Sequence, residues 1–262
     1  MNKKYIGIFD SGLGGLTTVS EVISKLPEEN IVFLADTKHL PYGSKSKEEI
    51  ISYTLNNIAY LKQYGLKAVV IACNTSDSNA SQSAREVYDL PIFGVIAPAA
   101  KKAAETTENK KVGILATEST IRSGRYEQLI AKQDPKIETY PMACPKLVPL
   151  IEEGTFKNDV ETLKETLNEY LSPLLEEGID TLILGCTHYD ILTDLIRELC
   201  PDLKLISSSR CVVQDLEEYL EKQDLKEEEN EGKRIYLSTS DPENFTKTAS
   251  YLIEGIRIEA AK

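Results

Sequence analysis

The sequence has few or no residues of several types, and each such scarcity excludes a class of protein or site. It has no tryptophan, only two histidines, and five cysteines with no CxxC spacing. This cysteine pattern argues against a disulfide framework and a closed zinc site, and it predicts a cytoplasmic protein. Apolar runs reach only about four to six residues, whereas a membrane helix needs roughly 20. Because the chain enters its first strand directly, we expect neither a signal segment nor a membrane span.

Basic side chains are also in the minority, since 30 Lys and Arg residues stand against 42 Asp and Glu residues. The formal net charge of −12 repels phosphate backbones, so nucleic acid is not expected as a partner. A small dianionic ligand would need local compensation from backbone N–H groups and hydroxyls. With 262 residues and 41% hydrophobic content, the chain can still bury one large core or two smaller ones.

What the sequence does contain is an internal repeat. The run LKQYGLKAVVIACNT (Leu61–Thr75) matches LLEEGIDTLILGCTH (Leu174–His188) at an offset of 113 residues. In each copy a Leu-rich amphipathic stretch ends at a glycine, Gly65 or Gly178, and an apolar run follows. This pattern predicts a helix, a C-cap glycine, a buried strand and a functional loop, used twice.

A second match places the same α/β unit in both halves. Tyr5–Ser11 (YIGIFDS) matches Lys111–Thr117 (KVGILAT) at an offset of 106 residues. Apolar, β-branched runs alternate with helical periodicity, which predicts βαβ crossovers and parallel sheets. The predicted strands are Ile6–Phe9, Ile31–Leu34, Ala68–Ala72, Ile92–Val95, Val112–Leu115, Ile137–Tyr140, Thr181–Gly185, Leu203–Ile206 and Ile235–Leu237.

We therefore predict an α/β fold of two pseudo-symmetric parallel-sheet domains with the active site in the cleft between them. The last strand and a helix at Asn244–Ile256 are left over from the second repeat and are expected to return to the first half. The expected domains are residues 1–97 plus 208–262, and residues 98–207. A further helix is predicted at Tyr189–Leu199.

Polar residues gather where the predicted strands end, which is where open parallel sheets bind ligands. They are Asp10-Ser11-Gly12, Asp36-Thr37 with Pro41-Tyr42-Gly43-Ser44, Cys73-Asn74-Thr75, Thr117 with Thr120, and Cys186-Thr187-His188. The glycines of Gly12-Leu13-Gly14-Gly15 suit either an anion site or a tight strand-to-helix turn. Asp10 beside them would repel a phosphate, so a nucleotide site is disfavoured.

Cys73 and Cys186 occupy equivalent positions of the repeat, each followed by hydrogen-bonding residues. If the halves face each other, one thiolate can remove a proton from one face of a stereocentre while the other thiol donates to the opposite face. Asp10 is the natural companion of Cys73, and His188 that of Cys186. By contrast, Cys144, Cys200 and Cys211 are interpreted as buried hydrophobes, His39 as a residue with a local role, and Glu152 as a surface acid.

The chain resembles the glutamate racemases, enzymes that interconvert L- and D-glutamate for peptidoglycan synthesis without a cofactor. The resemblance covers nearly the whole chain. It rests on IGIFDSGLGGLT (Ile6–Thr17), LADTKHLPYGSKS (Leu34–Ser46), ACNT (Ala72–Thr75), GILATESTIRSGRY (Gly113–Tyr126), CPKLVPLIEEG (Cys144–Gly154) and LGCTHYDIL (Leu184–Leu192).

The resemblance implies roles for individual residues. Cys73 would act on the α-proton of D-glutamate and Cys186 on that of L-glutamate, assisted by Asp10, His188 and Glu152. Neither a metal nor a cofactor is implied, and a homodimer is one implied assembly. The substrate would be held by Asp10, Ser11, Tyr42, Gly43, Asn74, Thr75, Thr117, Thr120, Thr187 and His188.

The chain departs from the family pattern at Asp190, where proline is common, at Ala97, where a charged residue is common, and at Ser76–Asn79, where alanine is common. These positions border the site and leave both thiols in place. Three other functions stay open at this point: a two-thiol racemase acting on aspartate, a non-catalytic amino-acid-binding protein, and a zinc or redox protein using Cys73, Cys186 and His188.

Overall fold

The computed structural model describes residues 4–228 and 231–261, and its strands form two wholly parallel sheets. Each of the nine predicted strands overlaps an observed one, so the predicted α/β class with two parallel sheets is confirmed. The strands are β1 (Tyr5–Asp10), β2 (Asn30–Ala35), β3 (Leu66–Ile71), β4 (Ile92–Gly94), β5 (Lys111–Ala116), β6 (Glu138–Ala143), β7 (Thr181–Gly185), β8 (Lys204–Ser207), β9 (Arg234–Ser238) and β10 (Glu259–Ala260).

The two sheets repeat one topology. The larger has the order β10-β9-β2-β1-β3-β4 and the smaller has the order β6-β5-β7-β8. If β1 corresponds to β5 and β3 to β7, the run β2-β1-β3-β4 is the same as the whole smaller sheet. The strand order reverses between β1 and β3 in the larger sheet and between β5 and β7 in the smaller one. Open α/β sheets bind their ligands beside such a switch point.

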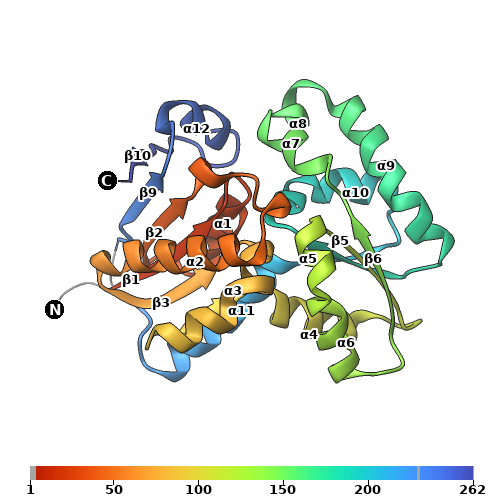
Figure 1. Cartoon of the computed structure of the whole chain (residues 1–262), viewed down its shortest axis with the longest axis horizontal. Helices are drawn as coiled ribbons and strands as arrows, with labels where there is room; N and C mark the ends of the chain where they lie inside the picture. The colour runs from red at the N-terminus through yellow and green to blue at the C-terminus, as the bar shows by residue number, and fades with distance from the viewer. Residues whose placement is uncertain (1–3, 229–230, 262) are drawn as a thin grey trace.

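The C-terminal elements lie beside the N-terminal ones. Figure 1 shows β9, β10 and α12 in blue next to the red β1 and β2, with the middle of the chain on the other side of the molecule. β9 pairs in parallel with β2, and β10 pairs with β9. The larger sheet is therefore assembled from both ends of the described chain.

Helices separate the strands. They are α1 (Gly15–Lys25), α2 (Lys47–Leu61), α3 (Asn74–Val87), α4 (Ile96–Thr106), α5 (Glu118–Ser123), α6 (Arg125–Gln133), α7 (Leu147–Glu152), α8 (Thr155–Asn158), α9 (Val160–Glu176), α10 (Thr193–Leu199), α11 (Ser208–Lys222) and α12 (Pro242–Ala249). Short 3₁₀ turns are η1 (Thr37–His39), η2 (Tyr42–Ser44), η3 (Lys62–Tyr64) and η4 (Thr187–Leu192). In the described ranges, no helix combines the length and apolarity that crossing a membrane requires.

Local sequence explains several helix ends. Ser46 and Glu49 form a reciprocal capping box at the start of α2, which satisfies two backbone N–H groups. Gly65 and Gly178 have φ values of +71° and +74°, the left-handed conformation that glycine adopts without strain. The C-cap glycines predicted from the repeat are thus in place before β3 and β7.

Two predicted helices differ in extent from the observed ones. The helix predicted at Tyr189–Leu199 begins as the 3₁₀ turn η4, and only Thr193–Leu199 is α-helical. Tyr189 is fully buried and its hydroxyl donates to the Cys144 carbonyl, so a tertiary contact overrides helical periodicity here. The helix predicted at Asn244–Ile256 ends at Ala249, after which the chain continues in turns.

The two halves meet where the glycine-rich turn after β1 lies against η4 of the second half. Gly14 has φ −57° and ψ −33°, so its backbone needs no special conformation. Space is what excludes a side chain, because a Cβ would overlap Thr187 Oγ1 and would lie 2.6 Å from the backbone nitrogen of His188. A Cβ on Gly12 would likewise overlap the Glu152 carboxylate. The glycines permit close approach of two backbones, and this contact explains the cluster.

We predict that Gly14→Ala lowers the free energy of unfolding by about 1–3 kcal/mol more than Gly7→Ala does. At Gly7 the added methyl group would meet the flexible ends of Leu66 and Leu61, the nearest 3.0 Å away, whereas at Gly14 it meets backbone. Urea unfolding of the two variants measures the difference. Equal losses would show that the contact between the halves has room for a side chain.

Candidate active site

A cavity of about 110 Å³ lies between the carboxyl ends of the two sheets. Its walls come from the loops after β1, β2, β3, β5, β6 and β7, so both halves contribute. The lining residues are Ser11, Pro41, Tyr42, Gly43, Ser44, Cys73, Asn74, Thr75, Thr117, Glu118, Cys144, Pro145, Val148, Pro149, Cys186, Thr187 and His188. The cavity thus lies beside both topological switch points.

Cys73 and Cys186 both line this cavity, one from each sheet. Cys73 stands between β3 and α3 as the N-cap residue, and Cys186 stands between β7 and η4. They are 5% and 6% exposed, so each thiol is nearly removed from bulk water. Their equivalent places in the repeat put two sulfurs on one enclosed space, as the sequence predicts for a two-base reaction.

A chain of hydrogen-bonding groups stands behind Cys186. Its Sγ lies 3.6 Å from His188 Nδ1, and His188 Nε2 lies 2.6 Å from Glu152 Oε1. The same carboxylate oxygen accepts a hydrogen bond of 2.8 Å from the backbone N–H of Leu13. Burial by itself lowers the pKa of His188, but the contacts with Cys186 and Glu152 outweigh it and raise that pKa well above its usual value. These contacts therefore favour the protonated form of the imidazole.

The surroundings of Cys73 are different. Its Sγ donates to Ser11 Oγ at 3.8 Å, and Asp10 lies behind. Burial, reinforced by the Asp10 charge, raises the pKa of the Cys73 thiol. Burial likewise raises the pKa of Asp10, although the His188 charge opposes this. The two thiols are therefore equivalent in position and unequal in electrostatics.

Asp10 also connects the halves. Its Oδ2 accepts a hydrogen bond of 3.0 Å from Thr187 Oγ1, whereas Oδ1 has no hydrogen-bond partner among the described residues. A buried carboxylate oxygen without a partner is costly unless another group reaches it. Asp10 Oδ1 is thus free to accept a proton or a hydrogen bond when a ligand or a thiol moves toward it.

Hydroxyl and amide groups close the cavity from the side of α3. Thr75 Oγ1 lies 2.8 Å from Thr117 Oγ1, which joins the first half to the second. Asn74 uses its amide to accept from Tyr126 OH at 2.6 Å and to donate to Ser208 Oγ at 3.2 Å. These side chains supply the uncharged polar groups that an acidic chain needs to hold an anion.

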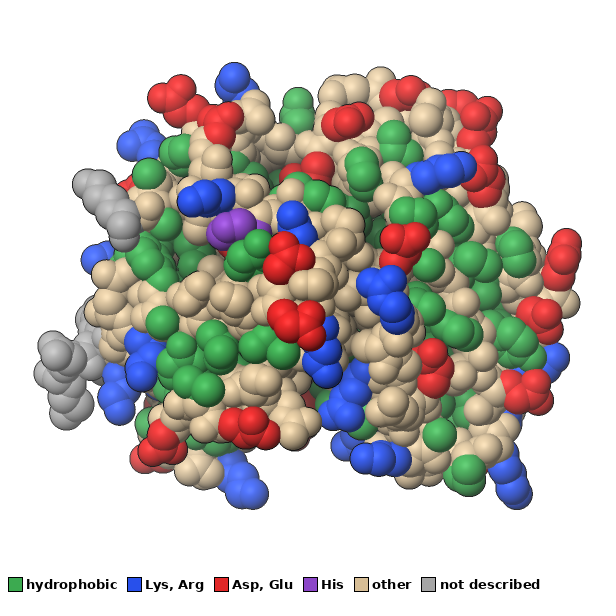
Figure 2. Space-filling model, viewed as in Figure 1, with side chains coloured by type: hydrophobic (Ala, Val, Ile, Leu, Met, Phe, Trp, Pro, Cys, Tyr) green, Lys and Arg blue, Asp and Glu red, His purple; other side chains and the backbone are tan. Residues whose placement is uncertain are grey.

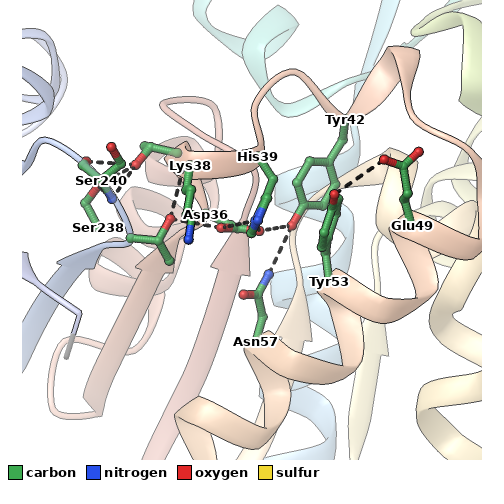
Figure 3. Close-up of polar contacts among 11 residues, drawn as sticks. Asp36, Lys38, His39, Tyr42, Glu49, Tyr53, Asn57, Ser238 and Ser240 are labelled. Carbon is green, nitrogen blue, oxygen red and sulfur yellow. Dashed lines mark hydrogen bonds and ion pairs between the residues drawn. The ribbon is translucent and has the colours of Figure 1, made fainter.

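Tyr42 lines the cavity, but its hydroxyl points away into a separate network (Figure 3). The hydroxyl donates to Asp36 Oδ2 at 2.5 Å and accepts from Asn57 Nδ2 at 3.2 Å. His39, for which a local role is predicted, contacts the same carboxylate at 2.8 Å. Tyr42 therefore offers its ring and backbone to the cavity.

The structure gathers ten of the thirteen predicted site residues around the cavity, and the other three stand one layer behind. Asp10 contacts Thr187, Thr120 contacts Thr117, and Glu152 contacts His188. Their individual roles stay predictions. Pro41 and Ser44 belong to the strand-end group predicted from the sequence, but no binding role is predicted for them. The lining residues that the sequence analysis does not single out as site candidates are Glu118, Cys144, Pro145, Val148 and Pro149. Cys144 and Pro145 directly follow β6, which ends at Ala143, three residues beyond the predicted end at Tyr140, so the strand-end rule reaches them only with the observed bounds.

The arrangement is suited to moving a proton between two faces of a small molecule in a shielded space. Within residues 4–228 and 231–261, no three His, Cys, Asp or Glu side chains are grouped so that they could hold a metal ion. On the face in Figure 2, acidic and basic side chains are interspersed over both halves. The two thiols and the His188 imidazole on the cavity wall favour acid–base chemistry on a small substrate.

Comparison with known proteins agrees with this geometry. The family model described as Asp/Glu/Hydantoin racemase matches residues 16–216. A glutamate racemase from Sulfurihydrogenibium sp. (strain YO3AOP1) is 42% identical over 255 residues, which cover 97% of this chain and 95% of the relative.

Solved structures give the same result. A glutamate racemase isoform from Bacillus anthracis superposes with a TM-score of 0.93 at 34% identity and covers 99% of this chain and 97% of its own. A glutamate racemase from Francisella tularensis in complex with D-glutamate superposes with a TM-score of 0.89 at 31% identity, with 99% and 97% coverage. The chain therefore belongs to the Asp/Glu/hydantoin racemase family.

Proposed function

We propose that this chain is a glutamate racemase that works without a cofactor and uses Cys73 and Cys186 as its two acid–base groups. The observation that carries the proposal is the placement of two repeat-equivalent thiols on one buried cavity between the sheets. The relatives named as glutamate racemases, one of them in complex with D-glutamate, support glutamate as the substrate.

The reaction needs one proton removed and one returned. From D-glutamate, a Cys73 thiolate takes the α-proton, the C–H bond breaks, and its electron pair remains on the α-carbon, delocalised toward the carboxylate. The Cys186 thiol then donates its proton to the opposite face, which gives L-glutamate and a Cys186 thiolate. The reverse turnover uses the thiols in exchanged roles, so atoms and charge balance over both directions.

The groups behind each thiol fit these assignments. A cationic His188 stabilises a neighbouring thiolate, and Glu152 keeps the imidazole protonated and oriented. Asp10 stands on the Cys73 side with one unpartnered oxygen, so it is placed to influence the proton on that thiol or to accept from the substrate ammonium group. Exclusion of water from the cavity strengthens each of these interactions.

We assign substrate binding to side chains and backbone on both sides of the cavity. Tyr42 contributes its ring and backbone, since its hydroxyl is engaged elsewhere. Thr120 acts through Thr117, to which it is hydrogen bonded. The other assigned residues are Asp10, Ser11, Gly43, Asn74, Thr75, Thr117, Thr187 and His188.

We also propose where the two domains begin and end and in which compartment the protein works. We take the domains to be residues 1–97 plus 208–262, and residues 98–207, because these ranges follow the two sheets. Relative motion of such units would open and close a cavity whose walls come from both. We place the protein in the cytoplasm, where it would supply D-glutamate for peptidoglycan synthesis.

The first test is solvent exchange. Purified protein in deuterated buffer with L-glutamate and no added cofactor should produce D-glutamate that carries deuterium at the α-carbon. Cys73→Ala and Cys186→Ala should each lower the racemisation rate about 1,000-fold, because each removes one of the two proton carriers. Circular dichroism follows racemisation and mass spectrometry follows the label.

Cys200→Ala provides a matched control, since Cys200 is also buried but does not line the cavity. It should leave the rate within about twofold of the unchanged chain. Full activity of either cavity cysteine variant would refute the two-thiol mechanism. Exchange with aspartate and none with glutamate would retain the mechanism and change the substrate.

A second test concerns Glu152. Glu152→Gln removes one of the contacts that raise the pKa of His188, so that pKa falls and the imidazole loses its proton at lower pH. If a protonated His188 is required, activity is lost as pH rises through that pKa. The alkaline limb of the kcat/KM profile should therefore move to lower pH, and kcat/KM at neutral pH should fall about 10- to 100-fold.

Glu153→Gln removes an equal charge one residue further along, on an exposed side chain. Its pH profile should coincide with that of the unchanged protein. A Glu152→Gln profile with the same alkaline limb would mean that His188 protonation does not depend on this carboxylate.

A further inference from the structure

Asp36 is a buried carboxylate that lies outside the cavity, and the proposed reaction does not use it. It directly follows β2, and its side chain is only 2% exposed. Three side chains surround it (Figure 3) and fill its two oxygens: Tyr42 OH at 2.5 Å, His39 Nδ1 at 2.8 Å and Thr239 Oγ1 at 2.9 Å. A buried carboxylate with three such contacts holds its partners strongly, because hydrogen bonds to a charged acceptor exceed neutral ones in strength.

Tyr42 connects this carboxylate to the cavity. Its side chain is 2% exposed, and its ring lies on the cavity wall while its hydroxyl lies on Asp36. Burial, together with the Asp36 charge, raises the pKa of Tyr42, so the hydroxyl keeps its proton and acts as a donor. Because the backbone holds one end of the Tyr42 side chain and Asp36 holds its hydroxyl, the ring has little freedom to move. Gly43 and Ser44, the next two residues, also line the cavity.

The other partners attach the same segment to its surroundings. We call residues 37–45 the Tyr42 loop. His39 stacks on Tyr53 of α2 with ring centroids 4.1 Å apart and an angle of 11° between the planes. At the other end, Thr37 Oγ1 lies 2.7 Å from Ser238 Oγ, at the end of β9. The loop pairs with no strand in the described sheets, and these side-chain contacts help to fix it, together with backbone hydrogen bonds such as that from Lys45 N–H to the Tyr42 carbonyl.

The network joins three parts of the sequence that lie far apart. Asp36 and Thr239 are separated by 203 residues, and Asn57 reaches the Tyr42 hydroxyl from α2. Lys38 N–H also donates to Thr239 Oγ1 at 3.0 Å. The end of β9 and the residue after it are thereby tied to a wall of the cavity, through Asp36 and through the contacts of Thr37 and Lys38.

We propose that Asp36 is a positioning residue, which sets substrate affinity by holding Tyr42 and the adjoining cavity wall at a fixed place opposite the thiols. The proposal rests on the proposed function for the identity of the substrate. Asp36 itself contacts neither thiol nor the cavity, so its loss should loosen the wall and leave the proton carriers intact. Binding in the ground state and in the transition state then weakens equally, which raises KM and leaves kcat nearly unchanged.

The experiment compares Asp36→Asn, Tyr42→Phe and the control Asp89→Asn, which removes a carboxylate from an exposed position. Asparagine retains the size of aspartate but loses its charge and one acceptor oxygen. We expect Asp36→Asn to raise KM for both enantiomers of glutamate about tenfold with kcat changed less than twofold. Tyr42→Phe removes only one hydroxyl from the same hydrogen bond and should raise KM in the same way, and the two changes combined should not add.

Amide hydrogen exchange gives a readout that does not require turnover. In Asp36→Asn, the amides of residues 42–45 should exchange about tenfold faster than in the unchanged protein, whereas those of α3 should not change. If the unchanged protein does not racemise glutamate, the proposed function fails, and the exchange experiment still decides whether Asp36 holds the loop.

The inference is overturned by either of two results in an active protein. One is an unchanged KM in both Asp36→Asn and Tyr42→Phe. The other is a loss confined to kcat, which would place Asp36 in the proton transfer. If Asp36→Asn does not fold, Tyr42→Phe decides alone, since it retains the carboxylate and removes only the bond to it.

Discussion

The close contact between the glycine turn after β1 and the η4 turn after β7 is the constraint on which the site depends. Glu152 accepts from the Leu13 backbone in the first half and contacts His188 in the second, while Thr187 donates to Asp10. These bonds form only because Gly12 and Gly14 leave no side chain in the way. The groups behind both thiols therefore owe their positions to one contact, and its loss would affect both sides of the cavity.

The groups that line the cavity differ in charge from the chain as a whole. A net charge of −12 belongs to a chain whose surface shows both signs interspersed. The polar side chains that line the cavity are the hydroxyls of Ser11, Ser44, Thr75, Thr117 and Thr187, the Asn74 amide, the His188 imidazole and the Glu118 carboxylate. Desolvation raises the pKa of both Asp10 and Cys73, so burial disfavours the charged form of each. Local composition and burial thus offset the sign of the whole molecule.

The repeat places the two thiols symmetrically, whereas contacts outside the repeat make their surroundings different. Cys73 and Cys186 hold equivalent places, but a histidine–carboxylate pair stands behind Cys186, and a serine and a buried aspartate stand near Cys73. The first half alone extends its sheet with β9 and β10, whose neighbouring side chains reach the wall near Tyr42. An enzyme that acts on two mirror-image substrates can use this difference, because chemically different groups then face the two sides of the bound substrate.

The amino-acid sequence alone is enough to predict the alternation of strands and helices, the internal repeat, the C-cap glycines and the two thiols at strand ends. These are local or periodic features, which propensity and spacing encode directly. Three features become visible only in the folded chain: the glycine cluster serves a backbone contact, η4 replaces the first turn of the helix predicted from Tyr189, and the Tyr42 hydroxyl is turned to Asp36. Some contacts of the site join residues far apart in the sequence: Leu13 and Glu152 are 139 residues apart, and Asp36 and Thr239 are 203 residues apart. A local sequence pattern cannot predict such pairs. Their energies depend on burial and distance, which exist only once the chain has folded.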